Sequence, residues 1–249
     1  MIDAVDNTPA WPEQWGGNKP GMQAGDPLDT SAEKDCRHLL SGLKNTAIAC
    51  AKEVSLLGLH KQVANRYIEP WSHITVLATA SDKGLANFFS LRAHPMAQPE
   101  FQVLAYRMLR NYLDSKPVAL NWGEWHIPQF ANMENSDDMS VEDRLKIGTA
   151  RNARLSYLTF DGEHSVEKDI KLHDDLATSG HFSPMEHVAQ AINDKNPGKF
   201  LSYPWSNFDT PGNGGECGWG QYRKLLVGEN KTSVDLDVIM KSKPDWIHT

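Results

Sequence analysis

Helical patterns that end at a glycine or a proline fill most of this 249-residue sequence. The longest begins at a capping box, Thr30–Glu33, continues with apolar residues at helical spacing and ends at Gly58. Few strands are expected, and residues 74–79 are the best candidate for one. The pattern therefore predicts a fold dominated by helices. With 40% hydrophobic residues the chain can bury one sizeable core, so residues 1–249 are predicted to form a single domain.

The same signals predict the remaining elements. Further helices are expected from about His60 to Pro70, from Asp82 through Leu91, from about Gln98 to Asp114, from Ser140 toward Ser156, and from Ser165 to Gly180. In the helix that starts at Thr30, one apolar stripe at helical spacing is expected in the core: Leu39, Leu40, Leu43, Ala47, Ala51 and Val54. Residues 1–30 are rich in proline and glycine and predict an extended arm, and residues 202–220 predict a loop.

Composition excludes several classes of function. The formal net charge is −7, and no basic run is long enough to bind nucleic acid. No apolar run approaches the roughly 20 residues that cross a bilayer, and no secretory signal is present. Cys36, Cys50 and Cys217 lie far apart and form neither a CxxC pair nor a zinc motif. We therefore expect a cytoplasmic protein that binds no nucleic acid, membrane or metal.

The segment Ser179–His187 carries the densest set of polar residues. One interpretation is structural, with Ser183 as the N-cap, Pro184 in the first position and Glu186 in the third position of a helix. That interpretation leaves His181 and His187 unexplained. Both histidines flank a predicted helix N-terminus, which suits an anionic or carbonyl-rich ligand. Zinc is excluded because neither HExxH nor HxxEH is present.

Two arginines stand out by their positions. Arg92 follows an apolar run between two predicted helices, and Arg66 lies just before the helix stop at Glu69–Pro70. Both are expected on the buried side of their helices. A lone arginine is usually a solvated surface residue, but a buried guanidinium suits bidentate binding of a phosphate or a planar pyrimidine.

These segments together resemble the flavin-dependent thymidylate synthases, in a phage-type branch with a circularly permuted motif order. Ala64–Pro70 is similar to the family's phosphate-binding arginine helix, and Asn87–Glu100 to its last motif, N-x-x-x-L-R-x-x-x-x-A-Q-x-E. Here both precede the A-R-x-S-Y segment Ala153–Tyr157 and the S-G-H-x-S-P-x-E-H segment Ser179–His187. Phage relatives share three further segments, which are Trp15–Gln23, Trp125–Pro128 and Gly218–Arg223. The resemblance covers nearly the whole chain.

The resemblance implies an α+β fold, helix-rich around a small, mainly antiparallel sheet, and an enzyme that methylates dUMP at C5 to give dTMP. Methylenetetrahydrofolate would supply the carbon, and FAD reduced by NADPH would supply the electrons. By position, Arg92 is the catalytic residue that holds the pyrimidine, Arg66 binds the phosphate, and Gln98 and Glu100 also bind substrate. The flavin site is implied to contain Asn87, His181, Ser183 and Glu186. Family members are homotetramers with sites at subunit interfaces.

One family segment is missing. In the permuted relatives an arginine-rich signature, T-H-R-x-x-S-R-N-x-x-S-S-R, lies just before the segment that starts at Trp15, and this sequence does not contain it. We expect either a homo-oligomer or a second chain that supplies the signature. Two other functions stay open: methylation or hydroxymethylation of dUMP or dCMP in a phage, and a non-catalytic or split subunit.

Overall fold

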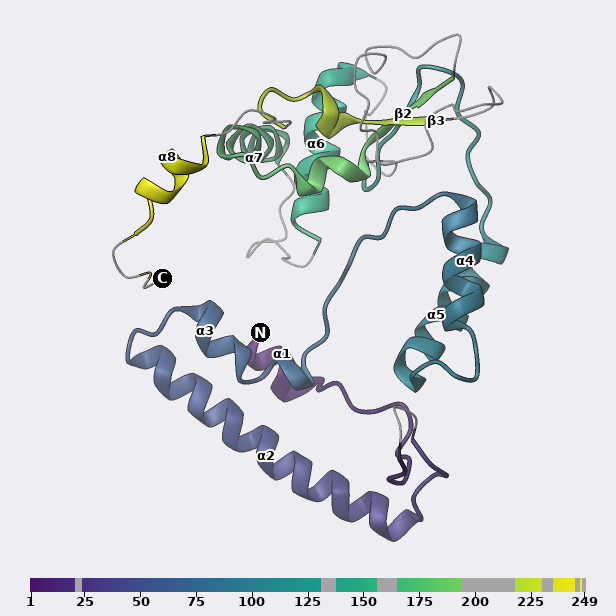
Figure 1. The fold of residues 1–249 in the computed structure, drawn as a ribbon, viewed down its shortest axis with the longest axis vertical. Helices are drawn as coiled ribbons and strands as arrows, with labels where there is room; N and C mark the ends of the chain where they lie inside the picture. Colours follow the sequence, from purple (N-terminus) through teal and green to yellow (C-terminus); the bar gives the residue numbers. More distant parts are fainter. Residues whose placement is uncertain are drawn as a thin grey trace. The chain divides into compact units, whose positions relative to one another are not determined.

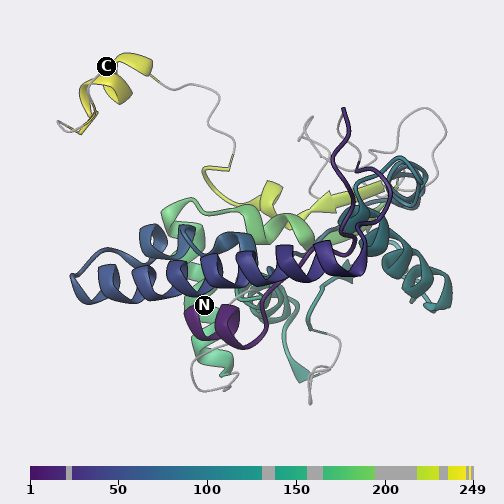
Figure 2. The ribbon, with the colours of Figure 1, turned by 90° about the horizontal axis from the view of Figure 1, so that it is seen from below.

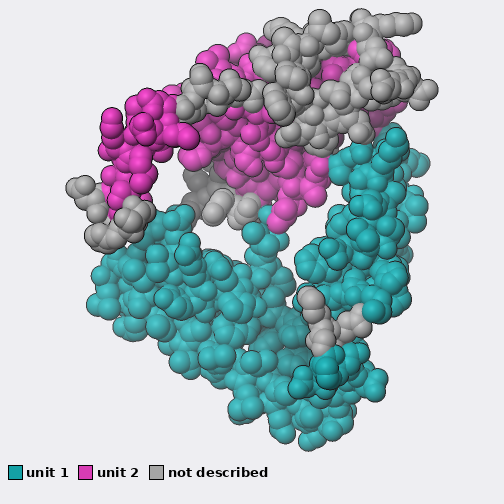
Figure 3. All heavy atoms as spheres, in the orientation of Figure 1, with its two compact units in different colours: residues 1–75, 80–117 teal, residues 76–79, 118–249 magenta. Residues whose placement is uncertain are grey.

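The chain forms two compact units in the computed structural model (Figure 1; Figure 3). Unit 1 comprises Met1–Thr75 and Ala80–Pro117, and unit 2 comprises Val76–Thr79 and Val118–Thr249. The structure describes residues 1–20, 24–130, 138–155, 165–193, 218–229, 235–244 and 247. A helix-rich chain with a small antiparallel sheet is confirmed. The single domain stays a prediction. Within the described ranges no helix is long and apolar enough to cross a membrane.

The regular elements described in unit 1 are helices. Its elements are α1 (Ile2–Asn7), α2 (Thr30–Leu56), α3 (Lys61–Arg66), the 3-10 helix η1 (Glu69–Trp71), α4 (Asp82–Arg92) and α5 (Pro99–Asp114). Its core cluster is formed by Val5, Ile48, Ala51, Ile68 and Trp71. The core therefore joins α1, the C-terminal half of α2 and the turn around η1.

The long helix α2, shown in Figure 2, ends as predicted but begins with a different cap. Asp29, not Thr30, is the N-cap, and its carboxylate accepts hydrogen bonds from the N–H groups of Ser31 and Ala32 at 2.9 Å. Gly58 follows the helix with a φ of +89°, which favours glycine. The expected core stripe is correct in its C-terminal part and wrong in its N-terminal part. Ala51 is buried and Ala47 packs against the core cluster, whereas Leu39 is 71% and Leu43 56% exposed, and Leu40 is exposed as well. The neighbouring elements cover the part of α2 that contains Ile48 and Ala51.

The N-terminal arm and the expected strand both differ from their predictions. Residues 2–7 form α1 with Val5 buried in the core, because the helix-breaking prolines begin only at Pro9. Beyond α1 the described residues before Asp29 form no helix, and a bridge pairs Gly16 with Pro27. Residues 74–79 form no strand, and Ile74 and Val76 are exposed. Val76–Thr79 instead belong to unit 2, although the chain on both sides of them belongs to unit 1.

Unit 2 packs two helices against a three-stranded sheet. Its elements are β1 (Trp125–His126), α6 (Val141–Ala153), α7 (Val166–Ser179), the 3-10 helix η3 (Ser183–His187), β2 (Ala189–Ile192), β3 (Gly218–Gln221), the 3-10 helix η5 (Tyr222–Leu225) and α8 (Leu236–Lys241). The sheet order is β1-β2-β3, all antiparallel, with Trp125 opposite Gln190 and Ala191 opposite Trp219. The core cluster contains Leu145, Met185, Val188 and Tyr222.

The helix ends in unit 2 agree with the sequence. Ser140 and Ser165 cap α6 and α7 with their side chains, and Gly180 ends α7 in the left-handed conformation with a φ of +78°. The predicted loop over 202–220 is wrong at its end, because Gly218–Gly220 belong to β3. Its preceding part, 202–217, lies outside the described residues.

Gly148 gives a test of the packing between α6 and the chain after β1. A Cβ at this position would lie 2.2 Å from Ile127 Cγ2 and 3.4 Å from the Pro128 carbonyl oxygen. We expect Gly148→Ala to destabilise unit 2, because overpacking costs about 1–3 kcal/mol and alanine gains only about 1 kcal/mol of helix propensity. Urea unfolding measures the change.

Gly42→Ala in α2 is the matched control, because no atom lies within 4 Å of the added carbon. It should raise stability by up to about 1 kcal/mol through helix propensity alone. Equal stabilisation by both alanines would contradict the close approach at Gly148.

Candidate functional site

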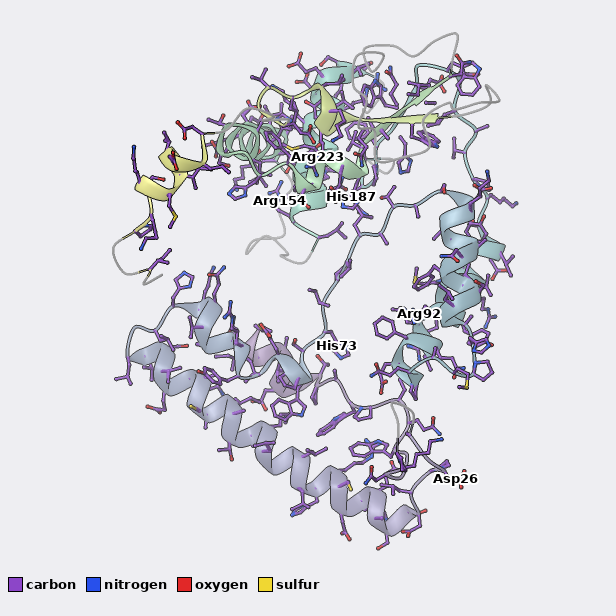
Figure 4. All side chains as sticks on the ribbon, viewed as in Figure 1. Asp26, His73, Arg92, Arg154, His187 and Arg223 are labelled. Carbon is purple, nitrogen blue, oxygen red and sulfur yellow. The ribbon has the colours of Figure 1, made fainter. Side chains whose placement is uncertain are left out.

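The residues expected at the site divide between the two units. Arg66, Asn87, Arg92, Gln98 and Glu100 lie in unit 1, whereas His181, Ser183 and Glu186 lie in unit 2. Figure 4 shows Arg92 at the end of α4, and Arg154, His187 and Arg223 in unit 2. Each set is described within its own unit.

In unit 1 the hairpin of α4 and α5 brings Arg92 to the first turn of α5. Arg92 is the last residue of α4, and its guanidinium carbon lies 5.9 Å from the centre of the Phe101 ring. Glu100 precedes Phe101 and is partly buried, while Gln98 occupies the N-cap position without a side-chain cap. Asn87 is exposed on α4. The hairpin therefore places a guanidinium, an aromatic ring and two polar side chains in one short region.

The expectation that both arginines face inward is wrong. Arg92 and Arg66 end short helices, α4 and α3, and both are exposed. The long side chain of an arginine at a helix end reaches solvent easily, which explains the difference. Within the residues that the structure describes, neither guanidinium forms an ion pair. Both forks are thus open to an external acceptor.

In unit 2 the predicted capping box at Ser183 is wrong. Ser183–His187 form a five-residue 3-10 helix with Phe182 at the N-cap, no side-chain cap is made, and Ser183 is exposed. The carboxylate of Glu186 instead accepts a hydrogen bond from Arg223 Nη1 at 2.8 Å. A charge-assisted bond to arginine is stronger than a cap to a neutral N–H group, so the pair with Arg223 replaces the capping box.

The two histidines of this segment have different surroundings. His181 is exposed. His187 is partly buried, and its Nδ1 lies 3.0 Å from Thr79 Oγ1, which belongs to the same unit. Burial lowers the pKa of His187. His187 thus holds the end of the connecting segment 76–79, and His181 is available to a ligand.

Two amide side chains, one from α6 and one from β3, donate hydrogen bonds to the backbone of η3. Asn152 Nδ2 at the end of α6 donates to the Pro184 carbonyl oxygen at 3.3 Å, and Gln221 Nε2 at the end of β3 donates to the Glu186 carbonyl oxygen at 3.1 Å. The remaining oxygens, Asn152 Oδ1 and Gln221 Oε1, are buried and have no hydrogen-bond partner in the described part of the chain. Such atoms are costly to bury unless something satisfies them.

A buried ion cluster joins α6 to α7. Asp169 on α7 is 0% exposed, and its carboxylate contacts Arg151 Nε at 3.2 Å and Arg154 Nη2. Arg151 also donates to the carbonyl oxygen of Gln129, a non-glycine residue with a φ of +64°. Burial lowers the pKa of both arginines, and in Arg154 the charge of Arg151 lowers it further.

Sequence reasoning missed this cluster. The signal was present, because Asp169 has helical spacing with Val166 and His173, and the same face of α7 also carries the apolar residues Ile170 and Leu176. A charged residue on such a face has to find a partner.

A series of hydrogen-bonded side chains connects η5 to α7 and α7 to α6. The Tyr222 hydroxyl lies 3.1 Å from His173 Nε2, and His173 Nδ1 lies 2.9 Å from Asp174 Oδ1. Because a carboxylate only accepts, Nδ1 carries the proton and Nε2 accepts from Tyr222. Lys146 Nζ completes the chain at 3.2 Å from Asp174. Burial raises the pKa of Tyr222 to about 12 and lowers the pKa of His173.

Acidification should weaken unit 2 because burial keeps His173 and His187 neutral. Their pKa values lie below the ordinary 6.5 in the folded chain, so the unfolded chain binds more protons. Their contribution to stability is complete above about pH 6.5 and is lost as the pH falls through the folded-state values. One histidine that stays neutral in the folded chain contributes at most about 1.4 kcal/mol per pH unit to this slope.

The midpoint of urea unfolding, measured between about pH 8 and pH 5, tests this, because the range runs from above to below the ordinary histidine pKa of 6.5. The midpoint should fall with pH, and the fall should be shallower in His173→Gln. A midpoint that is constant over this range would contradict neutral, buried histidines.

Neither a candidate metal site among the described residues nor a comparison with known proteins identifies the function of this site. Among the described residues, no group of three or more His, Cys, Asp and Glu side chains could hold a metal ion. Comparison with models of protein families, with curated proteins and with solved structures finds no match. The site must therefore be interpreted from its own residues.

Proposed function

We propose that the chain is a flavin-dependent thymidylate synthase, which methylates dUMP to dTMP with methylenetetrahydrofolate as carbon donor and FAD reduced by NADPH as reductant. One observation carries the proposal: four of the segments on which the resemblance rests meet around η3 in unit 2. They are Trp125–Pro128, the end of α6 with Arg154, Ser179–His187 and Gly218–Arg223.

The contacts among these segments are specific. β1 pairs with β2, which directly follows η3, and β3 pairs with the other edge of β2. Asn152, next to the A-R-x-S-Y segment, donates to Pro184, and Arg223 pairs with Glu186. Segments that are 30 to 100 positions apart in the chain are expected to meet in this way if they build one site.

The residues beside η3 fit a flavin. Its ring system offers both hydrogen-bond acceptors and an N–H donor. His181 and Ser183 are exposed groups that can donate to the acceptors of the ring system. Glu186 would act indirectly, because its carboxylate is paired with Arg223. When bound, the flavin would supply the redox chemistry.

Unit 1 supplies the nucleotide-binding groups of the proposal. Arg92 at the end of α4 would hold an acceptor edge of the pyrimidine with its planar fork, and Arg66 at the end of α3 would bind the phosphate. Gln98 and Glu100 at the start of α5 offer further polar contacts to the nucleotide, whereas Asn87 on α4 would contribute to the flavin site. We propose a homotetramer, or a complex with a second chain that supplies the arginine-rich signature.

Tritium release from dUMP labelled at C5 tests the proposal. Release should require the chain, FAD, NADPH and methylenetetrahydrofolate together, and the purified chain should show flavin absorbance. The assay is run with and without a peptide of the arginine-rich signature. Absence of both flavin binding and tritium release in both arms would overturn the proposed function.

A further inference from the structure

The ring of Phe101 lies next to the guanidinium of Arg92, which is the group that holds the pyrimidine in the proposed function. The distance of 5.9 Å from the Arg92 guanidinium carbon to the ring centre is within the range of about 6 Å for an attraction between a cation and an aromatic face. Phe101 is 50% exposed, although it sits on a helix with an apolar face. Its ring is thus not used mainly as core.

The turn between α4 and α5 keeps these two side chains together. His94 Nδ1 accepts a hydrogen bond from the Met96 N–H group at 3.1 Å, and the His94 carbonyl oxygen accepts from Gln102 Nε2 at 2.8 Å and from the Ala97 N–H group at 2.9 Å. The last bond of α4 runs from the Ala93 N–H group to Phe89. The backbone therefore sets where Arg92 meets the first turn of α5.

We propose that Phe101 is a positioning residue, whose ring restrains the plane of the Arg92 guanidinium so that its fork is ready to bind a pyrimidine edge. This inference rests on the proposed function. An exposed arginine samples many rotamers, and ordering it on binding costs affinity. A contact that orders the guanidinium before the ligand arrives lowers that cost. No ion pair in the described residues does this for Arg92.

The test is a titration of the full chain with dUMP, in which binding is monitored by NMR at the Nε–Hε signal of Arg92. Phe101→Leu should weaken dUMP binding about two- to five-fold, the size expected for an exposed cation–π contact, whereas Phe101→Tyr should bind as the wild type does. Tyr106→Leu is the matched control, because Tyr106 lies on the same helix and is 52% exposed. It should leave dUMP binding unchanged.

A double-mutant cycle separates positioning from a structural effect. In an Arg92→Gln background, Phe101→Leu should no longer change dUMP affinity, because the two side chains act as a pair. An equal loss in both backgrounds, or an unchanged affinity in Phe101→Leu alone, would overturn the inference.

A second measurement needs no ligand. The order parameter of the Arg92 Nε–Hε group should fall in Phe101→Leu and be retained in Phe101→Tyr. Equal order in all three proteins would overturn the inference. A wild-type chain that does not bind dUMP would overturn the proposed function, and the order parameters would still decide whether Phe101 restrains Arg92.

Discussion

Asp169→Asn should destabilise unit 2 by about 3–5 kcal/mol, the cost typical of removing one partner from a buried ion pair. The carboxylate of Asp169 is fully buried between Arg151 and Arg154, whose side chains are only 15% and 18% exposed. Asparagine keeps the shape but leaves two poorly solvated guanidinium groups close together. Urea unfolding, with hydrogen exchange in α6 and α7 as the local measure, should show a lower midpoint.

Asp175→Asn is the matched control. It removes a carboxylate from the same helix, but Asp175 is 63% exposed, and its ion pair among the described residues is with Lys171 one turn away. Its cost should be at most about 1 kcal/mol. Replacing the cluster as a whole, with Arg151→Met, Asp169→Leu and Arg154→Met, should recover much of the stability. A similar cost for Asp169→Asn and Asp175→Asn would contradict a buried ion cluster.

The sequence predicted the features that depend on neighbouring residues. Ser140 and Ser165 cap the N-termini of their helices and Gly180 caps a C-terminus, as expected, because a cap is made between groups two to four residues apart. The cap of α2 was misplaced by one residue, since Asp29 and Thr30 both offer a side-chain oxygen. In a helix cap, both groups of the hydrogen bond lie within the same short stretch of sequence, so the sequence pattern alone shows the interaction.

The sequence did not predict which apolar faces are covered. Leu39 and Leu43 belong to the predicted stripe of α2 but are exposed, because α1 and η1 pack on the C-terminal part of the helix, which contains Ile48 and Ala51. Residues 74–79 have the composition of a strand, but a strand also needs a partner, and in the described chain none pairs with them. In both cases the missing information is the position of a distant element.

The candidate site shows the same division. Local rules suggested a cap by Ser183 and Glu186, but Arg223, 37 residues from Glu186, provides a stronger partner. Asp169 was missed because its arginines lie 15 and 18 positions away on another helix. The two helices of the α4–α5 hairpin were predicted from their local start and stop signals, whereas the exposure of Arg92 and its contact with Phe101 were not.

Arg92→Lys should lower turnover of dUMP by ~10² or more, the loss typical of removing a preorganised donor from an active site. The charge is kept, but a lysine has neither the planar fork nor the pair of parallel N–H groups that can meet two acceptors of a pyrimidine edge. An ammonium group also fits less well over the ring of Phe101. Initial rates of tritium release from labelled dUMP measure the effect, and circular dichroism checks that the variant is folded.

Arg110→Lys is the matched control on the same hairpin. Arg110 is exposed on α5 and pairs with Asp114 one turn away, an interaction that lysine can replace. Its turnover should stay near that of the wild type. If Arg92→Lys and Arg110→Lys behaved alike in an active, assembled enzyme, Arg92 would not hold the pyrimidine. A selective loss at Arg92 is expected because a fork is needed where an acceptor edge is bound, whereas a charge suffices where a carboxylate is exposed.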